Sequence, residues 1–391
     1  MRVVVAPDSF KESLSAEKVA QAIADGVRDA LPSATILCVP MADGGEGSLD
    51  AVLAASGGER RLGQVSNANG HVVEAGWGWL GDGNAFIEMA AAAGLEQIPV
   101  QQRKPLEATS YGVGQLIQQA LDAGARRIVL GLGGSACNDA GAGLLQALGV
   151  RLLDDAGRAL PPGGAALQRL ASISLDDMDA RLPDVSFELA VDVDNPLCGP
   201  SGASAIFGPQ KGATPAEVAA LDQALAHFAS VCAQHFGKDE QNTPGMGAAG
   251  GLGFAIKTCF TARLRPGVEL IAELAGLVSA LEGADLVFTG EGRMDAQTLS
   301  GKTPAGVARY ASQRGIPVIA IAGSLGEGYQ ALYNVGVTAA FSLAPGPIAL
   351  EQACEHAAAY LRERARDCTR LWVAASAARP EVETCVLNGQ Q

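Results

Sequence analysis

The sequence predicts an α/β protein of two domains, one of them inserted into a parallel sheet that the two ends of the chain build together. Strands and helices alternate at both ends of the chain, which is the pattern of parallel βαβ units. The alternation breaks in the middle of the chain. The 391 residues also exceed what one hydrophobic core usually supports.

The N-terminal segment predicts two βα units. A β-branched strand over residues 2–6 stops at Pro7, and Ser15 is a suitable N-cap for the helix that follows. Residues 35–39 are the next expected strand, and a glycine-rich turn then leads into a helix over residues 47–55.

The middle of the chain predicts a different architecture. Residues 71–89 alternate as two antiparallel strands would, with a turn at residues 81–84. The elements expected after them are a helix at 113–121, a strand at 127–130, a further helix, a strand at 187–193 and a helix at 215–236 with Thr214 as its cap.

The C-terminal segment returns to the parallel pattern. Strands are expected at 285–290, 317–323 and 338–343, with a last helix over 350–373. Two N-terminal and three C-terminal units would build one five-stranded, flavodoxin- or Rossmann-like parallel sheet. The predicted units are an outer domain of residues 1–59 plus 277–374, an inserted mixed α/β domain of residues 60–276, and a flexible tail of residues 375–391.

Composition excludes several classes of protein. The formal net charge of −14 argues against nucleic acid or an anionic membrane as the main partner. The eight cysteines show no metal-ligand spacing, which is typical of small buried residues in a reducing compartment. No apolar run reaches the ~20 residues that cross a bilayer, and the N-terminus lacks signal-peptide features. These observations predict a cytoplasmic protein and leave a homodimer open.

Two polar clusters follow the N-terminal strands. Asp8, Ser9 and Lys11 come directly after the first strand, and Asp43 begins an Asp-Gly-Gly-Glu-Gly turn after the second. Because the carboxyl ends of parallel strands meet at one edge of a sheet, we expect both clusters to face one crevice. An ordinary polar turn is the alternative for each.

A glycine-rich segment over residues 131–143 joins a strand to a helix. Glycine lets the backbone approach a phosphate closely, and a helix N-terminus presents free N–H groups and a positive dipole end. This segment therefore predicts phosphate binding. The residues expected to contribute are Gly133, Gly134, Ser135, Asn138 and Asp139.

Two further charged residues are candidates for chemistry. Asp192 lies inside an apolar run at a strand end, which is a costly place for a carboxylate without a role, and we expect it to act as a general base. Lys211 lies in a Gly-Pro-Gln-Lys-Gly turn and is either a ligand for an anionic group or an ordinary solvated lysine.

The segment after the strand at 285–290 mixes acids and bases in a polar loop, which suits phosphoryl groups together with Mg²⁺. Its charged residues are Glu291, Arg293, Asp295 and Lys302. The Ser-Gly-Lys-Thr sequence at 300–303 imitates the end of a P-loop, but Ala296 stands where that motif requires glycine. We expect Thr303 to cap a helix that has Pro304 in its first turn.

These stretches together resemble the bacterial glycerate kinase family of the type that forms 2-phosphoglycerate. The resemblance keeps its order over nearly the whole chain, to about residue 372. The matching stretches are APDSFKESLSA (6–16), PMADGGEGS (40–48), IEMAAAAGLE (87–96), GLGGSACNDAGAG (131–143), DVDNPLCGPSGASAIFGPQKGA (192–213), PGMGAAGGLG (244–253), TGEGRMDAQTLSGKTPAGVA (289–308) and IAGS (321–324). Cys137 and Ala140 depart from the residues common in that family.

The resemblance implies an enzyme that uses ATP and Mg²⁺ to phosphorylate D-glycerate, with the substrate in a cleft between two domains. It also supports Asp192 as the base. Within that scheme we expect Asp192 and Lys11 to be catalytic, and Asp8, Ser9, Asp43 and Arg293 to bind the substrate. The residues expected at the nucleotide are Gly133, Gly134, Ser135, Asn138, Asp139, Lys211 and Lys302. Glu291 and Asp295 are expected at the metal.

Two other functions compete with this interpretation. A hydroxy-acid dehydrogenase that uses NAD would carry a Gly-x-Gly-x-x-Gly turn after the first strand, whereas the turn here is Pro-Asp-Ser-Phe-Lys-Glu-Ser. A binding protein without catalytic activity would not need carboxylates at so many strand ends.

Overall fold

A computed structural model describes residues 1–299 and 301–377 of the chain. One sheet has five strands that all pair in parallel. In spatial order they are β2 (Thr35–Cys38), β1 (Arg2–Val5), β11 (Leu286–Met294), β12 (Val318–Leu325) and β13 (Ala339–Ser342). Numbered within this sheet alone, the order is 2-1-3-4-5, which is the flavodoxin-like order. The parallel sheet predicted from the two ends of the chain is confirmed.

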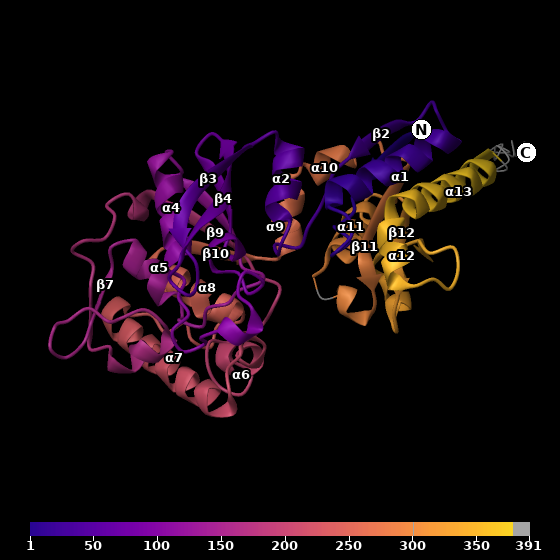
Figure 1. The fold of residues 1–391 in the computed structure, drawn as a ribbon. Helices are drawn as coiled ribbons and strands as arrows, with labels where there is room; N and C mark the ends of the chain where they lie inside the picture. The colour runs from indigo at the N-terminus through magenta and orange to yellow at the C-terminus, as the bar shows by residue number, and fades with distance from the viewer. Residues whose placement is uncertain (300, 378–391) are drawn as a thin grey trace, which may run out of the picture.

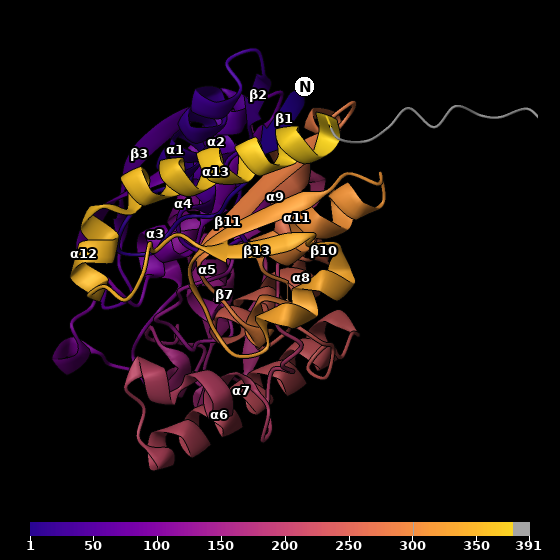
Figure 2. The same ribbon diagram turned by 90° about the vertical axis from the view of Figure 1, so that its right-hand side faces the viewer.

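Helices cover both faces of this sheet because its strands are apolar on both sides. Val3 and Val5 of β1 pack under α1 (Ala16–Ala30) and α13 (Ala357–Ala377), and Val4 packs on the side of α11 (Thr303–Ser312). Helices α1 and α13 lie side by side, as both views show (Figures 1 and 2). The alternation along β1 therefore separates two layers of core.

The second large sheet has six strands and is mixed. Its strands in spatial order are β10 (Thr261–Arg265), β9 (Ser186–Ala190), β6 (Arg127–Gly131), β5 (Asn84–Glu88), β4 (Val72–Gly81) and β3 (Glu59–Ser66). Strands β10, β9, β6 and β5 run parallel to one another, and β4 pairs antiparallel with both β5 and β3. The antiparallel pair β4–β5 was predicted, whereas β3 and β10 were not, because both carry charged residues at several positions.

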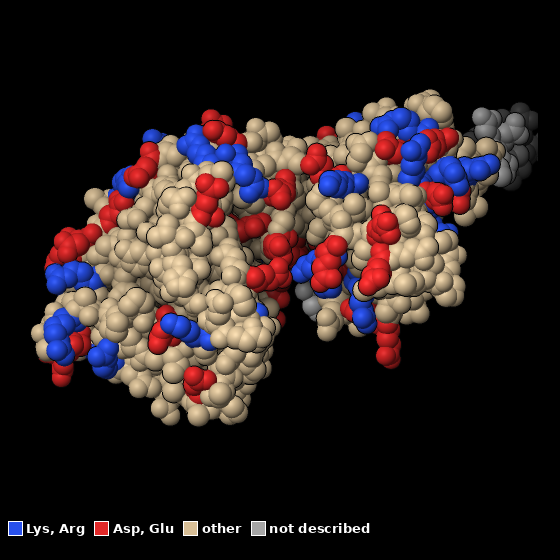
Figure 3. All heavy atoms as spheres, in the orientation of Figure 1, with Lys and Arg blue, Asp and Glu red and all other residues tan. Residues whose placement is uncertain are grey.

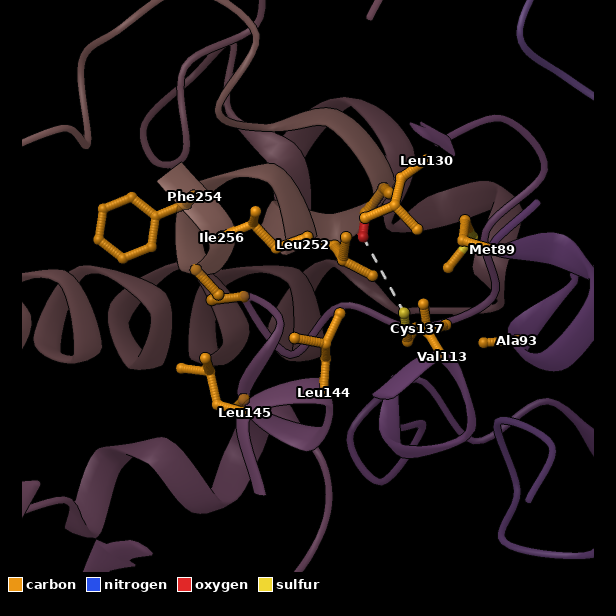
Figure 4. Packing of buried hydrophobic residues seen from close by; sticks show 14 of the residues in the cluster. Met89, Ala93, Val113, Leu130, Cys137, Leu144, Leu145, Leu252, Phe254 and Ile256 are labelled. Carbon is orange, nitrogen blue, oxygen red and sulfur yellow. Dashed lines mark hydrogen bonds between the residues drawn. The ribbon is translucent and has the colours of Figure 1, made fainter. Parts of the chain in front are cut away.

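The outer face of this sheet carries a second hydrophobic core (Figure 4). The helices of this part are α3 (Ala90–Ala93), α4 (Tyr111–Asp122), α5 (Ala142–Ala147), α6 (Ala203–Phe207), α7 (Pro215–Phe236) and α8 (Leu252–Cys259), and a small sheet pairs β7 (Arg151–Leu153) with β8 (Ser172–Ser174). Helix α7 begins as predicted, with Thr214 and Glu217 capping one another's backbone. Cys137 is fully buried in this core, where its Sγ lies 3.9 Å from the carbonyl oxygen of Ala249.

Helices α2 (Ser48–Ser56) and α9 (Gly267–Leu274) form a layer that both sheets share. Helix α2 packs against β4 and β5, and α9 packs against β9 and α11. One buried cluster accordingly joins Val4 and Val287 of the parallel sheet to Phe86 and Val129 of the mixed sheet. Figure 1 shows this shared layer, followed by the short α10 (Leu277–Ala280), between the two parts of the molecule.

The domain limits at residues 59 and 277 stay a prediction, because α9 packs against elements of both sheets. Two other expectations need correction. The last helix is divided into α12 (Leu350–Glu355) and α13, and α13 continues to Ala377, so the flexible tail does not begin at 375. Residues 378–391 of that expected tail lie outside the described residues. Within the described residues, no helix combines the length and hydropathy needed to span a membrane.

Candidate active site

The first of two adjoining cavities lies at the carboxyl edge of the parallel sheet. Strand order reverses between β1 and β11, and open α/β sheets bind ligands at such a point. The cavity has a volume of ≈ 530 Å³ and is lined there by Asp8, Lys11, Glu291 and Lys302. We call it the sheet cavity.

The second cavity, of ≈ 440 Å³, joins the two sheets. Its walls come from the turn at residues 43–46, the turn at 133–135 after β6, and Asp192 after β9. We call it the bridging cavity. Lys11, Asp43 and Glu46 line both cavities, so the two adjoin. Acidic side chains gather along this cleft between the two parts of the molecule (Figure 3).

Asp8 is held rigidly at the end of β1. Its Oδ1 accepts a hydrogen bond from the backbone N–H of Ser9 at 2.6 Å, and its Oδ2 accepts one from the Thr303 hydroxyl at 2.6 Å. Burial, together with the nearby carboxylates of Asp43 and Glu291, raises the pKa of Asp8 to about 7, although these hydrogen bonds oppose the shift. A cation bound beside Asp8 would therefore favour the charged form of this carboxyl group.

Asp192 projects from the opposite wall. Strand β9 ends at Ala190, three residues earlier than expected, and Asp192 is exposed to the cleft instead of lying within an apolar strand. Its Oδ1 accepts a hydrogen bond from the backbone N–H of Gly267 at 2.9 Å. Desolvation by the cleft walls raises the pKa of Asp192 to about 7, with smaller contributions from Asp43 and Glu269. That value suits a general base near neutral pH.

Glu291 and Arg293 belong to β11 and not to a loop, because this strand continues to Met294 alongside β12. Glu291 is buried, its Oε1 accepts the Thr298 hydroxyl at 2.6 Å, and its Oε2 lies 3.3 Å from the Lys302 ammonium. Burial raises the pKa of Glu291 above its ordinary value, although Thr298 and Lys302 oppose that shift.

Asp295 is engaged elsewhere. Its carboxylate accepts the backbone N–H of Gln297 at 2.9 Å and pairs with the guanidinium of Arg293 at 3.2 Å. It is not among the described residues that line either cavity. Arg293 lines the sheet cavity, so the structure brings Arg293 to the candidate site and leaves Asp295 beside it.

The glycine-rich segment does not present a free helix N-terminus. Asp139 is fully buried, and its carboxylate accepts the backbone N–H groups of Gly141 and Gly143, each at 3.1 Å, and that of Ser110 at 2.8 Å. The chain's own carboxylate therefore occupies the place expected for a phosphate. Only the earlier part of the segment, Leu132 to Ser135, lines the bridging cavity.

Two other residues expected at the nucleotide are also buried behind this turn. Asn138 is 1% exposed, and its amide donates to the Ser204 hydroxyl at 2.8 Å. Lys211 is 2% exposed, and its ammonium donates to the Ser135 hydroxyl at 2.9 Å and to the Cys137 carbonyl at 2.6 Å. Neither residue is among those that line the bridging cavity.

Glycine is required where the two turns meet. A Cβ on Gly133 would lie 2.7 Å from the Cα of Gly45, and a Cβ on Gly131 would lie 2.6 Å from the carbonyl oxygen of Gly44. Both distances are too short for real side chains. The glycines thus let the backbones of the 43–46 and 131–135 segments touch in the wall of the bridging cavity.

The site's acids suit Mg²⁺ without forming a complete protein cage. No group of three metal-binding side chains is found within the described residues. Mg²⁺ is usually held by one or two carboxylates together with phosphate oxygens and water. Asp8 and Glu291 both line the sheet cavity, and the Glu291 carboxylate is near enough to raise the pKa of Asp8. These two carboxylates are donors of the kind that such an ion requires.

Sequence reasoning missed two residues that organise this site. Thr303 was expected to cap α11, but Lys302 is the N-cap, and the Thr303 hydroxyl binds Asp8 instead. Gly267 supplies the N–H that holds Asp192. Neither carries a local signal, because each acts on a residue more than 70 positions away.

Comparison with known proteins identifies the family of this chain. The model of the "Glycerate kinase family" matches residues 3–373. The chain belongs to this family. It is 50% identical over 368 residues to the glycerate kinase of Bacillus subtilis strain 168, a match that covers 94% of this chain and 96% of the relative. It is 48% identical over 344 residues to the glycerate 2-kinase of Escherichia coli K12, covering 88% of this chain and 90% of the relative.

A solved structure supports the fold of this glycerate kinase family member. A Salmonella typhimurium LT2 protein, described under the name glycerate kinase 2, superposes with a TM-score of 0.88 at 47% identity. The match covers 96% of this chain and 99% of that one. The chain is therefore an enzyme of the kinase type with the two-sheet α/β fold of its relatives.

Proposed function

We propose that this enzyme transfers the γ-phosphoryl group of ATP to the 2-hydroxyl of D-glycerate, with Mg²⁺ as the metal. The observation that carries the proposal is that two adjoining cavities share Lys11, Asp43 and Glu46, while Asp192 lines one and Asp8 and Glu291 line the other. Phosphoryl transfer requires such an arrangement, with an acceptor, a base and charge-compensating groups around one line of transfer. The names of the relatives favour glycerate as the acceptor.

The base would act from the bridging cavity. Asp192 accepts the proton of the 2-hydroxyl while the oxygen attacks the γ-phosphorus, and the Gly267 N–H holds the carboxylate in position. Lys11 extends over both cavities and balances negative charge that the acceptor and the phosphates bring together.

The sheet cavity would hold the remaining charged groups. Asp8 and Glu291 are the proposed carboxylates for Mg²⁺, with Asp8 taking the place that we expected for Asp295. When bound, this ion neutralises phosphate charge. Lys302, held by Glu291, and Arg293 are the proposed phosphate or carboxylate contacts, and Ser9 and Asp43 the proposed hydrogen-bonding partners of the substrates. The need for ATP leads us to propose a cytoplasmic location.

Phosphorus NMR of the product made from D-glycerate and Mg-ATP tests the function directly. We expect 2-phosphoglycerate, and ADP release that depends on D-glycerate. A 3-phosphoglycerate product would overturn the regiochemistry. ADP release that does not change when D-glycerate is omitted would overturn the acceptor, and the absence of ADP release would leave a binding protein as the better explanation.

A further inference from the structure

Lys211 is a buried ammonium group behind the wall of the bridging cavity. It ends a short 3₁₀ turn over Pro209–Lys211, and its Nζ reaches the Ser135 Oγ and the Cys137 carbonyl oxygen. Burial lowers the pKa of Lys211, and the nearby Asp139 carboxylate opposes that shift. Holding a charged lysine at 2% exposure is costly, so a local role is expected.

The hydrogen bond between Lys211 and Ser135 determines where the hydrogen of the Ser135 hydroxyl points. An ammonium group has three N–H donors and no acceptor, so the Ser135 oxygen must accept in this hydrogen bond. The hydrogen of the Ser135 hydroxyl must then point away from Lys211. Ser135 is half-buried and lines the bridging cavity, so a ligand in that cavity can accept its O–H.

The charge of the cavity makes such a donor necessary. Its carboxylates are Asp43, Glu46, Glu96 and Asp192, and Lys11 is the one basic residue among its described lining. An anionic group placed there would meet strong repulsion unless hydrogen-bond donors and nearby positive charge offset it. A Ser135 hydroxyl aimed at the ligand, with an ammonium directly behind it, supplies both.

We propose that Lys211 is a positioning residue that fixes the Ser135 hydroxyl as a hydrogen-bond donor to an oxyanion in the bridging cavity. The oxyanion is a carboxylate of the acceptor or a phosphate of the nucleotide, so this inference rests on the proposed function. Lys211 acts through Ser135 and does not touch the ligand, which replaces the expectation that it binds an anion directly.

The alternative to this proposal is that the Ser135 hydroxyl donates its hydrogen to Lys211. A neutral Lys211 would accept from the Ser135 hydroxyl and activate it as a nucleophile, as serine–lysine pairs do. The Cys137 carbonyl oxygen at 2.6 Å from Nζ and the nearby Asp139 carboxylate both favour the charged form. This alternative predicts a covalent phosphoryl group on Ser135 after incubation with Mg-ATP, whereas our proposal predicts none.

The test measures binding of Mg-ATP and of D-glycerate separately by calorimetry, in the full chain. Ser135→Ala and Lys211→Met should each weaken one of the two ligands by about 10- to 100-fold, as expected for one lost hydrogen bond to a charged group. The affected ligand identifies the oxyanion as phosphate or carboxylate. The double variant should bind within about threefold of the weaker single variant, because both changes remove one interaction.

Lys238→Met is the control, because that lysine is exposed and lines neither the sheet cavity nor the bridging cavity, and the variant should bind both ligands as the wild type does. If Lys211→Met does not fold, ligand binding by Ser135→Ala decides whether the proposed hydrogen bond to the oxyanion exists. Unchanged binding of both ligands by Ser135→Ala, or phosphoryl transfer to Ser135 detected by mass spectrometry, overturns the proposal. A wild type that binds both ligands without turnover would refute phosphoryl transfer, whereas this inference uses only the binding of those two ligands and would still be tested by the variants.

Discussion

Asp8 and Asp192 line the cleft from opposite sheets, and each has a pKa raised to about 7. Their surroundings differ. Asp8 accepts two hydrogen bonds of 2.6 Å and lies beside other carboxylates, whereas Asp192 is exposed and accepts one N–H at 2.9 Å. The first arrangement suits a group that stays in place beside a cation, and the second suits a group that exchanges a proton.

Replacing Asp192 tests this division of roles. Asp192→Asn should lower kcat by about 10²- to 10⁴-fold, because a general base is removed. Binding of Mg-ATP, measured by calorimetry, should change by less than about threefold. Asp194→Asn, an exposed neighbour, is the matched control and should retain kcat. Near-normal turnover in Asp192→Asn would show that another group accepts the proton.

The same residue predicts the pH dependence of the reaction. A base with a pKa of about 7 is protonated and inactive below that pH, so kcat/KM for D-glycerate should rise with pH through about 7 and level off above it. The initial rate measured across this range should lose that rise in Asp192→Asn. A profile in the variant that matches the wild type would assign the pH dependence to another group, with Asp8 as the first candidate.

At the scale of residues, the sequence predicted the place of the cleft residues better than it predicted their roles. Asp8, Lys11, Asp43, Asp192, Glu291 and Lys302 all line one cavity or the other. Asp139, Asn138 and Lys211 were expected beside them and are buried instead. A glycine-rich turn before a helix predicts free N–H groups, but the sequence cannot show that Asp139 already accepts two of them.

At the scale of elements, the contact between the two glycine turns shapes the wall of the bridging cavity. Gly133→Ala should reduce kcat/KM by at least about tenfold, because its Cβ would lie 2.7 Å from the Cα of Gly45 and force the turns apart. Gly346→Ala is the control, since that position has open space around it. Steady-state kinetics and thermal unfolding of both variants would test this. Equal kinetics in the two would mean that the turns can separate without cost.

The elements that were predicted correctly have strong local signals. Helix α7 has a capping box and an apolar stripe, and β1, β6 and β12 are short β-branched or apolar runs. Strand β3 was missed because it begins with three charged residues, and half of its residues are exposed at the edge of the sheet. The extension of β11 through Glu291 and Arg293 was missed because polar residues at a strand end resemble a loop.

At the scale of the whole molecule, the raised pKa of Asp8 links folding to pH. The folded-state pKa of about 7 exceeds the ordinary value of 3.8, so between these values the folded protein holds a proton that the unfolded chain has released. The free energy of unfolding should therefore fall as pH rises through this window. Urea unfolding at about pH 5 and about pH 7 should show a smaller fall in Asp8→Asn. A fall of equal size would exclude Asp8 as its source.

The shared layer of α2 and α9 has a consequence for attempts to divide the chain. A fragment of residues 60–276 keeps α9 but loses α2 and α11, which would uncover Phe86 and Val129 on one face of the mixed sheet. Such a fragment should bind a hydrophobic dye and precipitate, and adding back the remaining segments of the chain should suppress both effects. The inserted segment therefore depends on the rest of the chain to cover one face of its sheet.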